Sequence, residues 1–492
     1  MIVAQSVAQA RNQHPTRTAI VFEGRSWNYR QLWSEGMRRY GVLKERGVKR
    51  HDRVGILIPN HPEWFFCYIA VSRLGAVAVP INPAYTKHEI QSLLDAADLA
   101  ALIVEDASVG SMGGIAVPAG CSLLSIADFT SAPAVHEDDA LGDLDDSQPE
   151  TIFFSSGSTG QPKGIVHCGR TLGGIADVVR DTWQITQADV TLVAMPLAFV
   201  YASIVAWLSA VRCGASIVLQ RRFDPQGTVE LIAKGGITIV MGVRSMFHLL
   251  LEARPPADVK QGKLRLCLTS GDVLSPALDK AFFEAFGCHL YEIYGLTETP
   301  VTVTHTPVKD RKSREFSCGQ PRPDVKIRLV DENGKEVPKG ELGELQCQTA
   351  LRFMEYFRNP EATNQVLKDD WFSTGDLMRE DADGYLYFVE RRKEMIKSSG
   401  FNILPGEVER IIQVMPGVKE VAVVGVPDER KGEQVKAFVV RDDGARLTGD
   451  EVIAECRDKL SKYKVPSVVE FIDALPRGAT GKLMRKHLRA AG

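Results

Sequence analysis

Ten consecutive residues constrain the fold and the chemistry of this chain more than any other segment. The run Ser-Ser-Gly-Ser-Thr-Gly-Gln-Pro-Lys-Gly fills positions 155–164 and directly follows the apolar segment 151–154. The apolar segment is typical of a buried strand, and the glycines behind it let the backbone turn its N–H groups toward an anion. The hydroxyl groups and Lys163 add donors and a positive charge. This pattern predicts a strand followed by a loop that binds a nucleoside triphosphate.

Two other interpretations of the run are a flexible Gly/Ser linker and a Walker A loop. Linkers are the commoner meaning of this composition, but the preceding strand and the Pro-Lys-Gly exit favour a phosphate loop. The Walker A spacing is absent, because Gly160 is followed by Gln161-Pro162-Lys163. The loop therefore belongs to another class of phosphate site.

Length and composition limit the number of domains and the class of protein. A chain of 492 residues is expected to form two or more domains, and 44% hydrophobic with 25% charged residues is typical of a soluble globular protein. A net charge of −3 provides no basic footprint for nucleic acid. The pattern contains neither a membrane span nor a secretion signal. The nine cysteines are scattered without a C-x-x-C pair, which fits a reducing cytosol and predicts a cytoplasmic protein.

Short β-branched runs alternate with longer amphipathic segments, which predicts an α/β fold with largely parallel sheets. We expect strands over 53–58, 101–104 and 237–240, and helices over 29–45, 87–96 and 225–234. Residues 324–350 break the alternation and predict a β-rich subdomain with a tight turn at 331–334. The segment after Glu390 predicts a separate α+β unit, with strands over 421–426 and 434–440 and a helix over 451–461.

The phosphate loop resembles the signature loop of the adenylate-forming enzymes, which include acyl-CoA synthetases, aryl-CoA ligases, luciferases and peptide-synthetase adenylation domains. Four further segments resemble motifs of this family and follow in its order. They are Tyr-Gly-Leu-Thr-Glu at 294–298, Ser-Thr-Gly-Asp at 373–376, Glu-Arg-Arg-Lys-Glu-Met-Ile-Lys at 390–397, and Pro-Arg-Gly-Ala-Thr-Gly-Lys at 476–482. The ordered set is more specific than the loop alone.

The resemblance implies a division of the chain into a large N-terminal adenylation domain and a small mobile one. The large domain, residues 1–390, combines layered α/β subdomains with the β-rich subdomain and binds ATP and the acid. A hinge at 391–394 pivots about Lys393, and residues 395–492 form the mobile α+β domain that carries the catalytic lysine. The other interpretation of the charged hinge run is a solvated helix end.

The resemblance also assigns the residues that bind ATP and Mg²⁺. Glu298 would bind Mg²⁺, Thr297 would contact the α-phosphate and act with Glu298 in catalysis, and Tyr294 would stack on adenine. Asp376 would accept hydrogen bonds from the ribose hydroxyls, and Arg391 would reach the ribose or a phosphate. The remaining ATP-binding residues are Ser155, Ser156, Gly157, Ser158, Thr159, Gly160, Lys163, Ser270, Gly271, Asp272 and Gly295. Without the motif, Glu298 would be a surface carboxylate and Arg391 one of several hinge arginines.

Lys482 is the main catalytic candidate. It lies in a Gly-rich loop near the end of the chain, where a lone lysine is usually solvated and without a function. In the family this lysine bridges the carboxylate and the α-phosphate in the adenylation transition state, which is electrostatic catalysis. In the second half-reaction the small domain would rotate about Lys393, withdraw Lys482 and present another face to the thiol.

Coenzyme A is expected on that second face. The predicted CoA-binding residues are Ser398, Ser399, Gly400, Lys431, Tyr463 and Lys464. Gly400 has no side chain and would let a narrow tunnel pass beside it. For Lys431, Tyr463 and Lys464 an ordinary surface role competes closely.

The acid pocket is expected from three mainly apolar segments, 198–203, 241–246 and 299–301, which favour an apolar acid. Its predicted lining residues are Phe199, Val200, Ala202, Met241, Arg244, Gly295, Pro300 and Val301. Phe199 stands where many relatives have a histidine, so a thiol-gating role of that histidine cannot be transferred. Arg244 either pairs with a second carboxylate on the substrate or, as the simpler interpretation, faces solvent or braces a loop.

These observations predict an AMP-forming acid–thiol ligase that uses ATP, Mg²⁺ and coenzyme A. The expected acid is aromatic, alicyclic or medium-chain. The expected partners are small molecules, a second copy of the chain in a homodimer, and a lysine acetyltransferase acting on Lys482. Two alternatives are a stand-alone adenylation enzyme that loads a carrier protein and a non-catalytic nucleotide-binding module. The presence of both Asp376 and Lys482 argues against the second.

Overall fold

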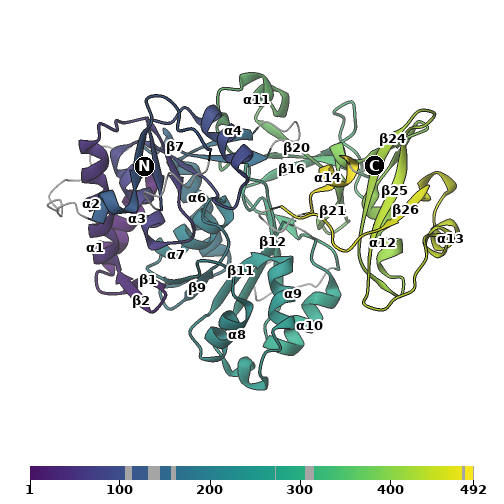
Figure 1. The fold of residues 1–492 in the computed structure, drawn as a ribbon, viewed down its shortest axis with the longest axis horizontal. Helices are drawn as coiled ribbons and strands as arrows, with labels where there is room; N and C mark the ends of the chain where they lie inside the picture. Colours follow the sequence, from purple (N-terminus) through teal and green to yellow (C-terminus); the bar gives the residue numbers. More distant parts are fainter. Residues whose placement is uncertain are drawn as a thin grey trace. The chain divides into compact units, whose positions relative to one another are not determined.

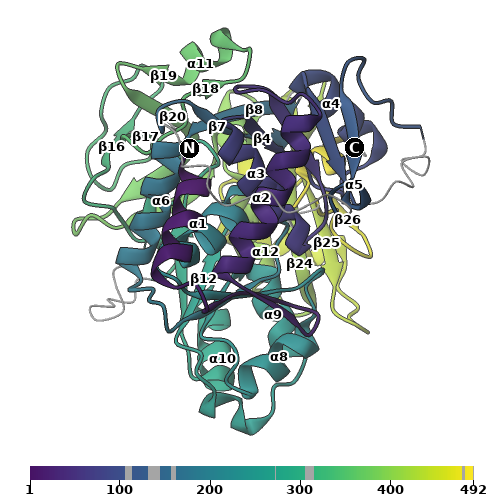
Figure 2. The same cartoon turned by 90° about the vertical axis from the view of Figure 1, so that its left-hand side faces the viewer.

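The structure is a computed structural model that describes residues 1–105, 114–130, 145–156, 162–271, 273–304, 315–478 and 483–490. The chain forms two compact units. Unit 1 comprises residues 1–326 and 348–371, and unit 2 comprises residues 327–347 and 372–492. Figures 1 and 2 show their elements. The predicted α/β fold class is confirmed. The structure groups the β-rich segment with the C-terminal part, whereas the predicted boundaries at 390 and 394 follow the motifs and stay predictions.

Unit 1 contains a nine-stranded sheet that is parallel in its centre and antiparallel at both edges. In spatial order its strands are β15 (Gln320–Pro321), β14 (Val303–Thr304), β13 (Leu290–Tyr294), β12 (Leu266–Ser270), β11 (Ile239–Val243), β9 (Val190–Val193), β10 (Ser216–Leu219), β1 (Thr18–Phe22) and β2 (Arg25–Asn28). The strand expected at 237–240 starts two residues later, at Ile239.

A second sheet of unit 1 has seven strands. In spatial order they are β18 (Glu355–Tyr356), β8 (Pro162–Cys168), β7 (Pro149–Ser156), β4 (Val77–Pro80), β3 (Arg53–Leu57), β5 (Ala101–Val104) and β6 (Ser122–Ser125). Its central strands are buried on both faces. In β4, Ala78 packs into one core while Val77 and Val79 pack into another, as the alternation of a parallel sheet covered on both sides requires.

Helices cover these sheets, and their boundaries follow local sequence signals. Asn28 and Gln31 form a capping box at the start of α2, and Pro62 occupies the first turn of α3. The helices of unit 1 are α1 (Ile2–Gln13), α2 (Tyr29–Glu45), α3 (Pro62–Leu74), α4 (Lys87–Ala97), α5 (Ile126–Thr130), α6 (Gly169–Thr182), the π-helix η2 (Tyr201–Leu208), α7 (Ser209–Val211), α8 (Pro225–Ala233), α9 (Arg244–Glu252), the 3₁₀ helix η3 (Ala257–Gln261), α10 (Pro276–Phe286) and α11 (Pro360–Val366).

Unit 2 contains two further sheets. The first consists of β16 (Lys326–Val330), β17 (Gly343–Gln348), β20 (Trp371–Glu380) and β21 (Leu386–Arg391), while β19 (Leu367–Lys368) belongs to the residues of unit 1. The second consists of β23 (Phe401–Ile403), β22 (Ile396–Ser398), β25 (Gly432–Arg441), β24 (Val418–Asp428) and β26 (Val468–Phe471). The helical elements are η4 (Arg392–Glu394), α12 (Pro405–Gln413), α13 (Gly449–Lys459), η5 (Lys462–Lys464) and α14 (Arg485–Ala490).

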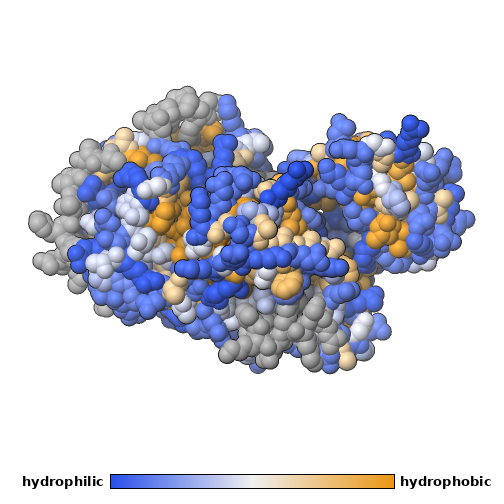
Figure 3. All heavy atoms as spheres, turned by 90° about the horizontal axis from the view of Figure 1, so that it is seen from below, coloured by the Kyte–Doolittle hydropathy of each residue, from blue (hydrophilic) through white to orange (hydrophobic). Residues whose placement is uncertain are grey.

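The surface is mainly hydrophilic on the face drawn in Figure 3, as the share of charged residues predicts. Patches of apolar residues lie between the hydrophilic ones (Figure 3). Among the described residues, no helix combines the length and apolar character needed to cross a bilayer.

Candidate active site

A tight loop after β13 presents Thr297 and Glu298. Gly295 begins this loop, and a Cβ atom added there would lie 2.5 Å from the backbone nitrogen of Val301. Val301 itself has φ of 54°, a left-handed conformation that β-branched residues rarely adopt. Such strained backbone persists only where its surroundings over-determine it, and it is concentrated at functional sites. The Tyr-Gly-Leu-Thr-Glu motif is therefore a closely constrained loop.

Two hydrogen bonds from other segments hold the backbone of this loop. Nε2 of His167 on β8 lies 2.7 Å from the carbonyl oxygen of Thr297, and the backbone N–H of Phe353 donates to the carbonyl of Glu298 at 2.7 Å. Burial lowers the pKa of His167 to about 4. The imidazole is therefore neutral near pH 7, and its Nε2–H tautomer donates to the carbonyl.

The side chain of Glu298 is held by Tyr356 on β18. The Tyr356 hydroxyl donates to Oε1 of Glu298 at 2.8 Å. Burial, together with the neighbouring Glu298 carboxylate, raises the pKa of Tyr356 well above its usual range, so the hydroxyl stays protonated and can donate. No described residue donates to Oε2 of Glu298. An oriented carboxylate oxygen of this kind fits Mg²⁺, which takes one or two protein carboxylates together with phosphate and water oxygens.

The phosphate loop connects β7 to β8. The two strands pair antiparallel, with Ser155 opposite Lys163 and Ser156 opposite Pro162. The Lys163 ammonium lies 4.9 Å from the centre of the Tyr356 ring. The rest of the predicted loop, Gly157, Ser158, Thr159 and Gly160, lies outside the described residues. The structure thus places the loop's lysine beside the tyrosine that holds Glu298.

The predicted adenine-side residues lie at the carboxyl ends of two neighbouring parallel strands. Ser270 is the last residue of β12 and Tyr294 the last of β13, and Ser270 pairs with Ile293. Gly271 follows with φ of 89°, a conformation that favours glycine. This edge of a parallel sheet is where ligands bind in α/β folds. Asp272 lies outside the described residues.

The predicted acid-pocket residues come from three segments of unit 1. Val200 and Ala202 are buried beside or within the π-helix η2, a rare element often found at functional sites. Met241 on β11 is fully buried. The remaining members are the half-buried Phe199 and Gly295 and the buried Pro300 and Val301.

Arg244 has a visible partner in this region. It begins α9, and its Nη1 donates to the backbone carbonyl of Val273 at 3.3 Å. The contact connects the start of α9 to the segment after β12. It therefore favours the loop-bracing role over a role in binding a second substrate carboxylate.

Unit 2 carries the predicted ribose acceptor. Asp376 on β20 is buried and forms an ion pair with Arg391 on β21, with Nε of the arginine 3.1 Å from Oδ1 of the aspartate. Its backbone N–H donates to the Thr374 hydroxyl at 3.1 Å. Two of the predicted nucleotide-binding residues thus lie side by side. Lys393 lies in the short helix η4. Lys482 lies outside the described residues.

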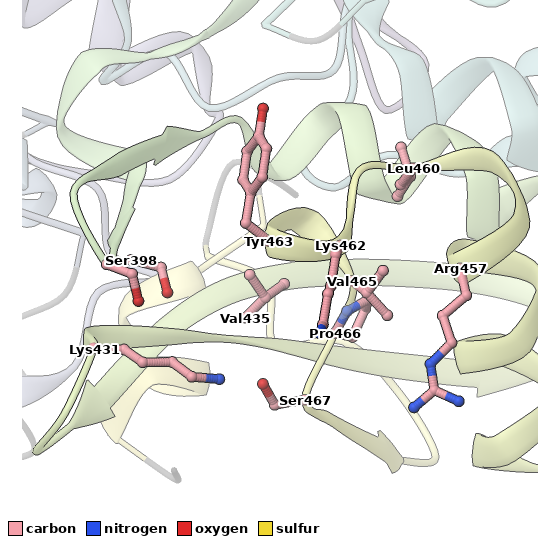
Figure 4. Close-up of a pocket in the computed structure, with 11 residues that line it drawn as sticks. Ser398, Lys431, Val435, Arg457, Leu460, Lys462, Tyr463, Val465, Pro466 and Ser467 are labelled. Atoms are coloured by element: carbon pink, nitrogen blue, oxygen red, sulfur yellow. The ribbon is translucent and has the colours of Figure 1, made fainter.

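Four of the six predicted CoA-binding residues line one cavity of about 480 Å³ in unit 2 (Figure 4): Ser398, Ser399, Lys431 and Tyr463. The end of β22 and the start of β25 bring the first three together, because the strands pair at Ser398 and the backbone N–H of Ser399 donates to the Lys431 carbonyl at 2.8 Å. Tyr463 comes from the short helix η5. Ser399 and Gly400, with φ of 51° and 82°, form the turn between β22 and β23. The positive φ of Gly400 favours glycine, whereas crowding does not, because among the described residues an added Cβ would meet no atom within 4 Å.

Lys464 does not join this cavity. Its ammonium lies 2.6 Å from Oε1 of Glu407 on α12, an ion pair that occupies the side chain. The structure instead places two other cations in the lining, Arg457 and Lys462. Tyr463 stacks on Phe401 with ring centres 4.3 Å apart, and both rings are more than one-third exposed. Sequence analysis missed Arg457, Lys462 and Phe401, because single cations and aromatics carry no motif.

Two family models match the chain, one over the N-terminal part and one over the C-terminal part. The model of the AMP-binding enzyme family matches residues 7–357, and that of the AMP-binding enzyme C-terminal domain matches residues 407–482. The chain belongs to the AMP-binding enzyme family.

Among its relatives, a feruloyl-CoA synthase of an Amycolatopsis species is 33% identical over 483 residues, covering 96% of both chains. A fatty acid–[acyl-carrier-protein] ligase of Streptomyces coeruleorubidus is 31% identical, covering 97% of this chain and 94% of the relative. The ATP-bound structure of MatB from Rhodopseudomonas palustris superposes with a TM-score of 0.92 at 29% identity, covering 99% of this chain and 98% of that one.

This AMP-binding enzyme is an AMP-forming acyl- or aryl-CoA ligase that uses ATP, Mg²⁺ and coenzyme A. The predicted family, reaction class and cofactors are thereby confirmed. Two positioning residues, His167 and Tyr356, were missed by sequence analysis because their partners lie 130 and 58 positions away in the chain.

Proposed function

We propose that the enzyme activates an apolar acid of the aromatic, alicyclic or medium-chain class. The observation that supports this is the wall of the predicted pocket, in which Val200, Ala202, Met241 and Val301 are buried apolar residues. Arg244, the cation of this set, donates to a backbone carbonyl. A dicarboxylic acid would leave its second carboxylate against apolar side chains, which is unfavourable without a hydrogen-bonded partner.

In the first half-reaction a carboxylate oxygen of the acid attacks the α-phosphorus of ATP. A new O–P bond forms, the bond to the β-phosphate oxygen breaks, and pyrophosphate leaves. Bound Mg²⁺ supplies charge neutralisation on the phosphates. Glu298 would hold that ion, Thr297 would contact the α-phosphate, and Lys163 with the loop 155–160 would hold the outgoing phosphates. Lys482 would bridge the two anionic reactants as negative charge develops between them.

In the second half-reaction the thiol of coenzyme A loses its proton and its sulfur attacks the acyl carbon. The C–S bond of the thioester forms, the bond between the acyl carbon and the phosphate oxygen breaks, AMP leaves with that electron pair, and the thiol proton passes to solvent. The cavity lined by Ser398, Ser399, Lys431 and Tyr463 would hold the nucleotide end of coenzyme A. Its lysine side chain and exposed aromatic ring suit phosphates and adenine.

The two half-reactions need different neighbours at the acyl carbon, and we propose that a hinge at residues 391–394 provides the change. In this proposal residues 1–390 form the adenylation domain and 395–492 the mobile one, with Lys393 as pivot. Lys393→Pro tests it, because proline restricts φ to about −65°. Single-turnover assays should show a larger loss in thioester formation than in adenylation. Wild-type rates in both steps would exclude Lys393 as the pivot.

A panel of carboxylic acids tests the acid class. The purified enzyme with ATP, Mg²⁺ and coenzyme A should release AMP and pyrophosphate fastest with aromatic, alicyclic or medium-chain acids. A preference for a short or dicarboxylic acid would contradict the proposal.

A second candidate function is the loading of a carrier protein instead of coenzyme A. It is favoured by one observation, the fatty acid–[acyl-carrier-protein] ligase among the relatives. Single-turnover transfer from the enzyme-bound adenylate to coenzyme A or to phosphopantetheinylated carrier protein separates the two. Faster transfer to the carrier would favour the second candidate.

Three further expectations stay predictions. Sedimentation velocity tests the homodimer, and fractionation of the source cells tests the cytoplasmic location. Incubation with a protein acetyltransferase and acetyl-CoA, followed by mass spectrometry, tests acetylation of Lys482. Acetylation removes the lysine charge, so the modified enzyme should keep its fold and lose adenylation.

A further inference from the structure

We propose that Tyr356 is a positioning residue that couples the phosphate-binding Lys163 to the metal-binding carboxylate of Glu298. The inference rests on the proposed function for the roles of Lys163 and Glu298. Its own evidence is that one tyrosine contacts both residues through two different parts of its side chain.

The hydroxyl of Tyr356 fixes the carboxylate. It donates to Oε1 of Glu298 at 2.8 Å. A hydrogen bond to an ionised acceptor is about twice as strong as a neutral one and is directional. With Oε1 engaged in this way, Oε2 has no donor among the described residues and is the atom left for a metal ion. The hydroxyl therefore selects which oxygen faces the ligand and at what angle.

The aromatic ring of Tyr356 contacts the ammonium group of Lys163. The Lys163 ammonium lies 4.9 Å from the ring centre, within the range of a cation–π contact. A lysine side chain loses several rotatable bonds on ordering, and a fixed aromatic face restricts the space it samples. The phosphate-loop cation and the metal-binding anion are thus held by one rigid group.

Tyr356 is itself anchored from two sides. The backbone N–H of Tyr356 donates to the Thr363 hydroxyl at 3.0 Å, and β18 pairs with β8 through Tyr356 and Ile165. The strand β8 begins beside Lys163. A short strand that pairs with the exit strand of the phosphate loop therefore carries the residue that touches both the loop lysine and Glu298.

The two contacts can be removed one at a time. Tyr356→Phe keeps the ring and deletes the hydroxyl, whereas Tyr356→Leu deletes both. The measurement is the affinity for ATP by isothermal titration calorimetry, without acid or coenzyme A, once with Mg²⁺ and once with EDTA. Because no acid takes part, the result does not depend on the acid class or the acceptor, and its failure is distinguishable from failure of the proposed function.

We expect Tyr356→Phe to weaken binding of Mg²⁺-ATP about tenfold, the usual scale for one hydrogen bond to a charged group. It should leave metal-free ATP binding within about twofold of wild type, because the hydroxyl acts through the metal site. Tyr356→Leu should weaken both. An unchanged or increased affinity of Tyr356→Phe for Mg²⁺-ATP, or an equal loss with and without the metal, would overturn the proposal.

Two controls separate positioning from a loss of folding. Tyr29→Phe deletes another buried hydroxyl of unit 1, which donates to the Ala215 carbonyl at 2.5 Å, and should lower thermal stability while leaving both ATP affinities unchanged. Glu298→Gln should reproduce the metal-dependent loss, and Tyr356→Phe added to it should cause little further loss. Additive losses in that double mutant would contradict an action through Glu298.

Discussion

The Oδ1 atom of Asp376 lies 3.1 Å from Nε of Arg391, across the neighbouring strands β20 and β21. The aspartate is the predicted ribose acceptor, and the arginine is the first residue of the predicted hinge. A change of backbone direction at Arg391 would therefore act directly on the carboxylate that is expected to bind the nucleotide. This contact connects nucleotide binding to hinge geometry within unit 2.

Asp376→Asn should weaken ATP binding tenfold or more, on the scale of about 1.5–3 kcal/mol for a hydrogen bond to a charged group. We also expect the variant to lose the ability to distinguish ATP from its deoxyribose analogues. Wild type should bind 2′-deoxy-ATP and 3′-deoxy-ATP less tightly than ATP, and the variant should bind all three similarly. Glu470→Gln is the matched control, because Glu470 forms an ion pair with Lys436 in the same unit at 2.8 Å without a predicted ribose role. Equal discrimination in Asp376→Asn and wild type would contradict the assignment.

Lys482→Ala should separate the two half-reactions. Removal of one preorganised charge typically costs ~10²–10³ in rate, so adenylate formation should fall by that factor. Conversion of supplied acyl-adenylate to the thioester should largely survive, because in the proposed cycle Lys482 has then left the site. Lys486→Ala, at an exposed lysine four positions later, is the control and should retain both activities. Equal loss in both half-reactions of Lys482→Ala would exclude the alternating-domain mechanism.

Local signals in the sequence predicted the elements whose boundaries depend on neighbouring residues. The helix expected at 29–45 matches α2, since Asn28 and Gln31 supply its capping box, and the strand expected at 101–104 matches β5. The predicted nucleotide residues Asp376 and Arg391 lie side by side, and four predicted CoA residues line one cavity.

Contacts between distant segments were not predictable in the same way. Lys464 belongs to a basic run, and only the packing of α12 shows that Glu407 pairs with it. His167 and Tyr356 act on the Thr297–Glu298 loop through strand pairing and tertiary packing, which no local motif encodes. The strand expected at 237–240 instead spans Ile239–Val243, because its apolar run continues past Val240 into Met241.

The buried His167 should make stability depend on pH. Its pKa is about 4 in the folded enzyme and about 6.5 when unfolded, because burial disfavours the charged imidazolium. The unfolded state therefore binds more protons below pH 6.5, and folding stability is lost as pH falls from 6.5 toward 4. His167→Gln cannot titrate but keeps an amide donor for the Thr297 carbonyl. Relative to this variant, wild type should lose roughly 2 kcal/mol between pH 7 and pH 5. Chemical denaturation at the two pH values measures it, and a pH-independent difference would contradict the buried neutral state.

Gly295→Ala should damage the catalytic loop by steric conflict. The added Cβ would lie 2.5 Å from the nitrogen of Val301 and 3.0 Å from the carbonyl oxygen of Thr299, which are backbone atoms that no rotamer change can move. Val301 already has φ of 54°, so the loop has little room to relax. We expect a stability loss of about 1–3 kcal/mol, the usual cost of overpacking.

The folded fraction of Gly295→Ala should also lose adenylation activity, because the loop movement that relieves the clash would displace Thr297 and Glu298 from the phosphates. Pyrophosphate release at saturating ATP measures this on protein whose folded fraction is checked by thermal denaturation. Gly236→Ala is the control in the same unit, since its added Cβ would meet no atom closer than 3.4 Å. Wild-type adenylation by stably folded Gly295→Ala would mean that the position of Thr297 and Glu298 does not depend on the close approach of Gly295 to Val301.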